Sequence, residues 1–151
     1  MAGVTNRGKK VILNTYFRAD ATDEPVAFKL LLVTSAVAPG PDQSVLSGLT
    51  EVASGNGYTT GGEAVTRDAT GFDVITQVDA SDHALIQIKD IVWTASGGPI
   101  PTSGSAPRYA CLMDDAATPN LVAFFDLVSD RTVSDTQTLT LQDCEIRLNE
   151  T

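Results

Sequence analysis

Three closely spaced apolar segments between residues 84 and 128 constrain the fold of this chain more than any other feature of its sequence. In the first, residues 84–93, the side chains of one parity are nearly all apolar, which is typical of a half-buried strand. Residues 108–113 and 121–128 combine β-branched and aromatic residues, which favour strands over helices. We therefore expect three successive strands at the centre of the core.

Other segments add strand patterns that are separated by turn residues. Residues 26–34 are almost continuously apolar, which indicates a strand buried on both faces or lying in a subunit interface. Residues 72–78 alternate between apolar and polar side chains. Because turn signals rather than helical crossovers lie between the strands, we predict an all-β fold, an antiparallel β-sandwich or jelly-roll-like single domain.

The C-terminal pattern changes parity in its middle. Residues 138–141 alternate cleanly, but the apolar positions at Cys144, Ile146 and Leu148 fall on the opposite parity. One extra residue near Asp143 would restore the alternation, so we predict a β-bulge there.

The length of 151 residues suits one domain with a real core. We expect a flexible N-terminal arm over residues 1–10 and a single β-sandwich domain over residues 11–151. Residues 9–19 place several apolar side chains on one helical stripe, which favours a short amphipathic helix, with a strand as the competing interpretation. Residues 39–58 form a long irregular loop, and such loops commonly contact something.

The charge and hydropathy of the chain exclude several classes of partner. A net charge of −9 and a pI near 4.3 would repel a nucleic acid, and the basic cluster Arg7, Lys9 and Lys10 fits either an acidic protein surface or a solvated chain end. No apolar run approaches the length of about 20 residues that a membrane span needs. The apolar run 11–13 ends at Asn14, too early for a signal-peptide core, so we expect synthesis in a cytoplasm.

The two cysteines, Cys111 and Cys144, are too few for a disulfide framework. Both lie in predicted strands, where small buried thiols are common. We interpret both as reduced core residues.

A glycine-rich stretch at residues 55–62 superficially resembles a phosphate-binding loop. In the dinucleotide pattern the third glycine would fall at Thr60, and in the P-loop pattern the lysine position is Glu63. A carboxylate at that position would repel phosphate. We therefore interpret the glycines as turn residues with positive φ and predict no cofactor.

His83 is the only histidine, and we expect it in a solvated turn, with no second histidine to complete a zinc site. The acidic pairs Asp79/Asp82 and Asp114/Asp115 lack the regular spacing of a calcium loop. The sequence therefore predicts no metal ligands.

Serine chemistry also lacks a motif. The stretch 103–105 suggests a nucleophile elbow but does not have the Gly-x-Ser-x-Gly form. Trp93 closes an apolar strand, where tryptophan is more often part of the core than a carbohydrate-stacking platform. We predict no catalytic residue, and therefore no enzyme and no small-molecule substrate.

Three stretches form a distinctive set: EVASGNGYTTGG at residues 51–62, VWTASGGPI at 92–100 and RYACLMDD at 108–115. In this order, after a segment like residues 12–17 and a strand like residues 28–34, they resemble a family of small virion structural proteins of tailed bacteriophages. The resemblance covers most of the chain. It implies a non-enzymatic virion component, which in different members is labelled as head decoration or as tail-associated.

This resemblance leads to a hypothesis about function. We expect a capsid decoration, or cement, protein that binds the outer surface of the assembled capsid. Its partners would be the major capsid protein and copies of itself, as a homotrimer at threefold positions. Residues 4–10 and 39–58 are the expected contact regions, and the expected location is the virion.

Two alternatives differ in class. A tail or baseplate accessory protein would be present in far fewer copies and would bind host glycans through Trp93, Tyr109 or Tyr58. A β-sandwich hydrolase would depend on His83, the only histidine.

Overall fold

The computed structural model describes residues 2–5, 8, 12, 27–78 and 83–149, and these residues form ten β-strands. The strands are β1 (Ala2–Val4), β2 (Ala27–Thr34), β3 (Glu63–Thr66), β4 (Val74–Val78), β5 (His83–Ile88), β6 (Ile91–Thr94), β7 (Pro107–Asp114), β8 (Leu121–Asp126), β9 (Thr138–Leu141) and β10 (Cys144–Asn149). All the pairings between them are antiparallel. The predicted all-β, antiparallel fold is confirmed.

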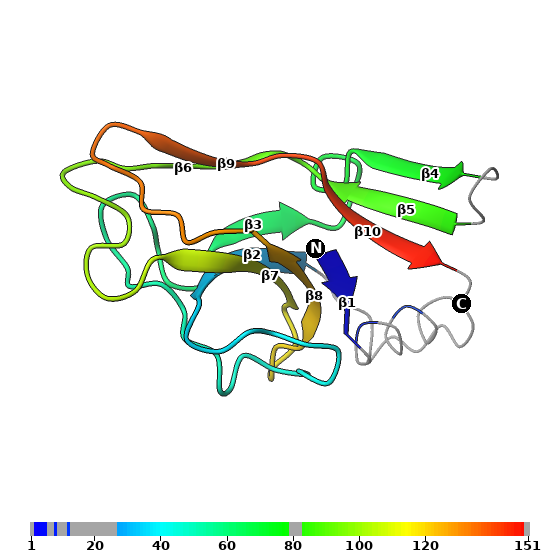
Figure 1. The fold of residues 1–151 in the computed structure, drawn as a ribbon. Coiled ribbons are helices and arrows are strands. Elements are labelled where there is room, and N and C mark those ends of the chain that lie inside the picture. Colours follow the sequence, from blue (N-terminus) through cyan, green and yellow to red (C-terminus); the bar gives the residue numbers. More distant parts are fainter. Residues whose placement is uncertain (1, 6–7, 9–11, 13–26, 79–82, 150–151) are drawn as a thin grey trace.

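The strands form one large sheet and two small ones. The large sheet has the order β1-β8-β7-β2-β3, and the small ones have the orders β10-β5-β4 and β6-β9. In Figure 1 the two small sheets lie together above the large one, and β1 lies beside β10. The domain is therefore a two-layer sandwich in which the second layer is divided between two sheets.

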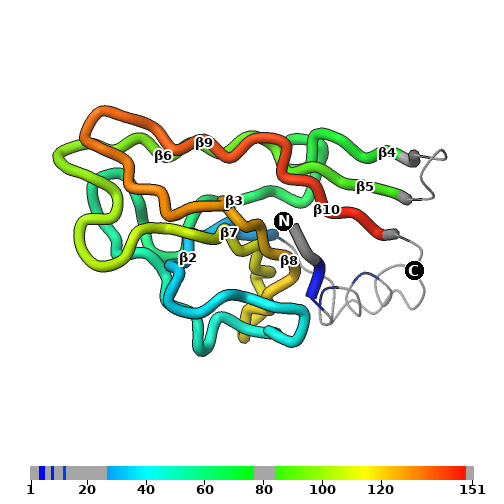
Figure 2. The backbone as a smooth tube through the Cα atoms, in the orientation of Figure 1, coloured from blue at the N-terminus to red at the C-terminus, as the bar shows by residue number. Residues whose placement is uncertain are grey.

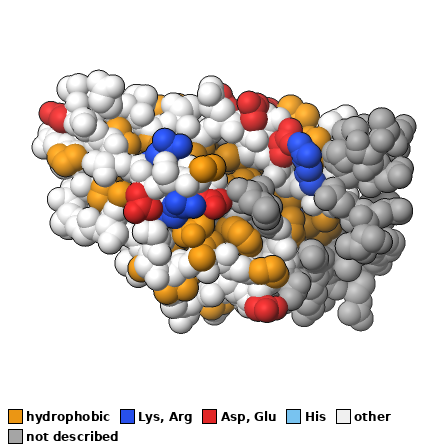
Figure 3. Space-filling model, in the orientation of Figure 1, with side chains coloured by type: hydrophobic (Ala, Val, Ile, Leu, Met, Phe, Trp, Pro, Cys, Tyr) orange, Lys and Arg blue, Asp and Glu red, His pale blue; other side chains and the backbone are white. Residues whose placement is uncertain are grey.

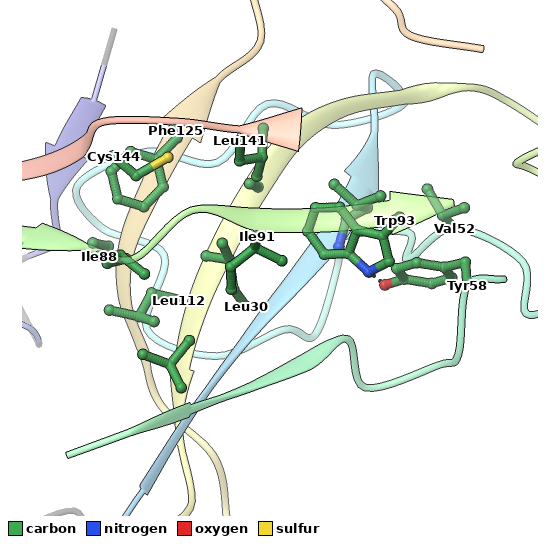
Figure 4. Packing of buried hydrophobic residues seen from close by; sticks show 14 of the residues in the cluster. Leu30, Val52, Tyr58, Ile88, Ile91, Trp93, Leu112, Phe125, Leu141 and Cys144 are labelled. Carbon is green, nitrogen blue, oxygen red and sulfur yellow. Dashed lines mark hydrogen bonds between the residues drawn. The ribbon is translucent and has the colours of Figure 1, made fainter. Parts of the chain in front are cut away.

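The main core fills the space between these layers. The large sheet contributes Leu30, Leu112 and Phe125 to this core, and the small sheets contribute Ile91 and Leu141, as Figure 4 shows. Trp93 is 1% exposed and lies beside Tyr58 at one end of this core, with ring centroids 6.2 Å apart. Burial of these large side chains supplies the main driving force for the fold.

A second apolar cluster covers the opposite face of the large sheet. It contains Leu31, Val33, Cys111, Met113 and Leu121, with Leu46 and Leu49 packed against it. The last two belong to the loop that follows β2, so this loop folds back over the sheet. Strand β2 is consequently buried on both faces, as its continuous apolar sequence predicts.

Residues 83–94 form two strands in different sheets rather than the single strand expected from the sequence. The break at residues 89–90 lies opposite a break at residues 142–143, and the pairing continues in register from Ile91↔Leu141 to Ile88↔Cys144. The two paired segments, residues 83–94 and 138–149, thus have the same number of residues across the break.

The change of parity predicted near Asp143 is present. The prediction of a β-bulge is wrong, because neither of the two paired segments has an extra residue. Instead, the two paired segments change orientation together at the break, where Asp143 has a φ of 52°. Gln87 donates to the Asp143 carboxylate (2.9 Å), and Gln142 donates to that of Asp90 (3.3 Å). One consequence is that Val92, assigned to the apolar face by parity, is 51% exposed.

The start of the chain differs in part from the expected flexible arm. Residues 2–4 are the edge strand β1, paired with β8. The buried Thr5 hydroxyl donates to the carbonyl of Leu121 (2.6 Å). The helix expected over residues 9–19 lies outside the described residues, except for Ile12.

Both cysteines are buried and unpaired, as predicted. Burial raises the pKa of the Cys111 thiol to about 12 and that of Cys144 to about 11. Since only the thiolate is strongly nucleophilic, both thiols are chemically protected in the folded protein.

A tyrosine hydroxyl completes the edge of the large sheet. Strand β3 pairs with β2 only as far as Leu30, so the next buried residue along that edge needs other partners. There the Leu32 N–H donates to the Tyr58 hydroxyl (3.0 Å), and the Leu32 carbonyl accepts from the Val52 N–H (2.9 Å). The phenol thus occupies the place of a missing strand residue.

The Tyr58 hydroxyl in turn donates to Oε1 of Glu51 (2.7 Å), which also accepts from the Gly61 N–H (2.6 Å). Burial first, and then the hydrogen bond to Glu51, raise the pKa of Tyr58 well above its ordinary range. The phenol therefore stays protonated and can keep donating to the carboxylate.

We predict that Tyr58→Phe destabilises the domain by about 1–3 kcal/mol, because it leaves the buried Leu32 N–H without an acceptor. Urea unfolding followed by tryptophan fluorescence measures the change. Tyr109→Phe is the matched control, since no described contact of Tyr109 uses its hydroxyl, and it should change stability by less than about 0.5 kcal/mol. Equal effects of the two changes would contradict the role given to the Tyr58 hydroxyl.

Candidate interaction surfaces

The glycine-rich stretches join two loops at one end of the sandwich. The Asn56 side-chain amide donates to the carbonyl of Pro99 (2.9 Å), and the Ser96 N–H donates to the carbonyl of Asn56 (3.0 Å). The Thr102 hydroxyl donates to the carbonyl of Ser54 (3.2 Å). The loops around residues 54–58 and 95–102 are therefore held together as one unit.

Glycine is required here by close backbone contacts. A Cβ at Gly57 would lie 2.0 Å from the carbonyl oxygen of Thr94, and one at Gly62 would lie 2.1 Å from that of Leu30. Both glycines have positive φ, 98° and 68° respectively. This agrees with the interpretation of residues 55–62 as turns rather than as a phosphate-binding loop.

Two of the three aromatic residues considered for glycan stacking are not accessible. Trp93 and Tyr58 are each 1% exposed, and only Tyr109 is partly exposed. The guanidinium of Arg108 lies 5.7 Å from the centroid of the Tyr109 ring. No aromatic platform for a sugar is formed by these three residues together.

The acidic and histidine candidates do not come together in the described part of the chain. Asp114 is buried, and its carboxylate accepts from the Asn120 N–H (2.7 Å) and side-chain amide (2.6 Å), so it closes the turn between β7 and β8. The backbone of His83 begins β5 instead of lying in the expected turn, and Asp79 and Asp82 lie outside the described residues. Among the described residues, no group of three His, Cys, Asp or Glu could hold a metal ion.

The serine candidates lie in an exposed turn. Ser103 and Ser105 flank Gly104, whose φ is 79°, in the loop between β6 and β7. This loop carries no strand-to-helix turn of the kind that presents a nucleophilic serine.

The sheet β10-β5-β4 carries apolar side chains beyond the core. Ile146, Ile86 and Ile75 are directly opposite one another on its three strands, and they run from buried, through half-buried, to 76% exposed. Leu148, one step further along β10 on the same face, is 43% exposed. Figure 2 shows these three strands extending past the end of β8. We call Ile75, Ala84, Ile86 and Leu148 the projecting face.

A second surface feature borders β9. A groove of about 590 Å³ lies between β9 and the segment that connects β8 to it; its lining residues are Leu127, Arg131, Thr132, Val133, Ser134, Gln137, Thr138, Leu139, Thr140 and Leu141. We call this the β9 groove. Figure 3 shows that the face of the molecule over β7, β8 and the loop below them also carries several patches of exposed apolar atoms.

An ion pair fixes the turn at one end of the β9 groove. Arg108 contacts both carboxylate oxygens of Asp126 (2.8 and 3.2 Å), and the hydrogen bonds from this guanidinium are the main reason that the Asp126 pKa is lowered. The same carboxylate accepts from the N–H of Val128 (2.7 Å). Val128 is 74% exposed with a φ of 70°, an unfavourable conformation for a β-branched residue.

The two predicted contact regions are partly used within the chain itself. Of residues 4–10, Thr5 is buried against β8. Of residues 39–58, the carbonyl of Ser44 accepts from the Leu121 N–H (2.9 Å), and Leu46 and Leu49 pack on the second cluster. Much of the long loop therefore covers its own sheet.

We predict that Gly57→Ala costs clearly more stability than Gly104→Ala. Both residues have positive φ, but a Cβ at Gly104 meets nothing within 4 Å. The control should therefore cost about 1–2 kcal/mol from backbone conformation alone, and Gly57→Ala should exceed it by about 2 kcal/mol through the clash with Thr94. Urea unfolding of both variants gives the comparison, and similar costs would mean that the two loops can separate at no penalty.

The comparisons with known proteins add no family to this picture. No protein-family model matches the sequence, and no curated protein matches it. The described residues also form no helix that is long and apolar enough to cross a membrane.

Proposed function

We propose that this protein is a structural component of a tailed-bacteriophage virion, and specifically a decoration protein that binds the outer surface of the assembled capsid and stabilises it. The major capsid protein would be its partner. A protein that binds only the assembled lattice shifts the equilibrium away from disassembly by its binding free energy.

The observation that carries this proposal is the use made of the three stretches that resemble virion proteins. Residues 51–62 and 92–100 contact each other, since Tyr58 lies beside Trp93 and the Asn56 amide donates to the carbonyl of Pro99, and residues 108–115 contribute Ala110 and Leu112 to the same core. Their glycine and aromatic residues therefore serve the architecture of the domain. This supports a protein whose role is to present a rigid body to other proteins.

The projecting face supports the further proposal that copies of the chain associate, as a homotrimer at threefold positions of the lattice. Exposed isoleucine and leucine side chains on the same face of a sheet are typical of protein contacts. The chain carries few other large exposed apolar residues in its described part, namely Val37, Val92 and Val128.

A tail or baseplate accessory protein is the alternative. The burial of Trp93 and Tyr58 removes two of the aromatic residues on which glycan binding would depend. This observation favours the head over a glycan-binding tail position.

Copy number tests the proposal most directly. In particles purified from the phage that encodes the chain, we expect hundreds of copies, measured by gel densitometry against the major capsid protein. Particles lacking the gene should assemble but release DNA at a lower temperature, and added purified protein should restore the wild-type temperature. A handful of copies per particle would assign the protein to the tail, and its absence from particles would exclude both positions.

We predict that Ile75→Asp shifts the oligomer toward monomers without unfolding the domain, because it places a charge in the projecting face. Val92→Asp is the matched control, since Val92 is also exposed, at 51%, but lies in another sheet. Analytical ultracentrifugation measures the association, and urea unfolding should show changes below about 0.5 kcal/mol for both variants. Identical association of wild type and Ile75→Asp would exclude this face as the subunit contact.

A further inference from the structure

Strand β9 has one paired edge and one open edge. In its ladder with β6, the Ala95 N–H donates to the carbonyl of Gln137 (2.8 Å), which fixes the alternation of hydrogen-bonded and non-hydrogen-bonded pairs. Thr138 and Thr140 therefore occupy non-hydrogen-bonded pairs, and their N–H and C=O groups point away from β6. In the described part of the chain, no backbone partner covers these groups.

The β9 groove lies along this open edge, and its other wall is also extended chain. Val133 exchanges two hydrogen bonds with Ile100 (both 2.9 Å), and the Arg131 N–H donates to the carbonyl of Pro107 (2.8 Å). Since amides alternate in direction along an extended chain, the backbone of Thr132 points the other way, into the β9 groove. The backbone groups of Thr138 and Thr140 on β9 and those of Thr132 on the opposite wall therefore border the same space.

The side chains that line the β9 groove determine which ligand fits between these backbone groups. Leu127 and Leu139 are partly buried and supply apolar side chains, whereas Val133 and Leu141 also line the β9 groove but are 5% and 7% exposed and belong to the main core. Arg131 is the only charged residue of the lining, in a chain of net charge −9. Its guanidinium donates to the carbonyl of Leu127 (3.2 Å), which holds it beside the groove.

The open edge is also unprotected. Sheet edges in soluble proteins are usually guarded by lysine, proline, a bulge or a covering loop. The sequence of β9, Thr-Leu-Thr-Leu, contains none of these residues, and its pairing with β6 shows no bulge.

We propose that the β9 groove binds an extended segment of another protein, which adds to β9 as a strand. Unpaired backbone groups at strand spacing are recognised by the backbone of a second strand, and side chains of alternate residues give specificity. The segment would carry apolar residues at alternate positions and an acidic residue facing Arg131. This inference goes beyond the proposed function, because it holds whether or not the protein decorates a capsid.

The experiment selects ligands from a library of random ten-residue peptides displayed on yeast, with the full-length protein as bait. We expect enrichment of peptides with alternating apolar residues and one Asp or Glu. Amide NMR spectra of the protein with a selected peptide should change at residues 132 and 138–141. Enrichment of peptides without alternation, or spectral changes elsewhere, would overturn the proposal.

Three variants sharpen the test. Thr140→Pro removes an outward N–H but no bond to β6, so it should weaken peptide binding by about tenfold or more, whereas Thr140→Val should not. Arg131→Glu, which leaves the strand unchanged, should reverse the selected charge from acidic to basic. Loss of binding in both Thr140 variants, or an unchanged charge preference with Arg131→Glu, would contradict the geometry.

A second copy of the chain is the competing occupant. If the full-length protein self-associates and Thr140→Pro, but not Thr140→Val, dissociates it, the β9 groove is a subunit interface and the proposed partner is wrong. Amide spectra of Thr140→Pro that match wild type outside residues 137–141 establish that this variant is folded.

Discussion

The two hydrogen bonds of the Tyr58 hydroxyl are the interactions on which the architecture of this domain most depends. The hydroxyl accepts from the buried N–H of Leu32, beyond the last pairing of β2 with β3, and donates a hydrogen bond to the carboxylate of Glu51. A sheet edge that is buried cannot leave its amides to water, so a side chain has to replace the missing strand. The ring of the same tyrosine packs beside Trp93, which ties the edge of one layer to the core of the other.

The strands themselves are largely readable from the sequence. Alternation and continuous apolar runs predict β2, β4, β7, β8, β9 and β10. The break at residues 89–90 is not readable, because it arises from a rotation shared with residues 142–143, which lie far away in the sequence. A parity rule applied to one strand assigns Val92 to the core, and only its pairing with Thr140 shows that it faces outward.

The candidate surfaces were less predictable than the fold. The glycines at residues 55–62 are recognisable as turn residues, but their contacts with Thr94 and Leu30 depend on tertiary packing. The β9 groove is built from residues 127–134 and from β9, and neither sequence has a motif. Its open edge follows from hydrogen-bond register alone. The exposure of Ile75 likewise goes with the place of β4 at the edge of its sheet, which composition does not reveal.

The ribbon formed by residues 83–94 and 138–149 keeps one register from His83↔Asn149 to Thr94↔Thr138 while it passes from one sheet to the other. Insertion of a single residue in either segment would shift the register of every later residue pair and turn buried side chains such as Ile88 or Trp93 toward water. Changes of length in this ribbon are therefore tolerated only when both segments change in length together. During divergence, such a protein would accumulate substitutions here and confine its insertions and deletions to the loops outside the ribbon.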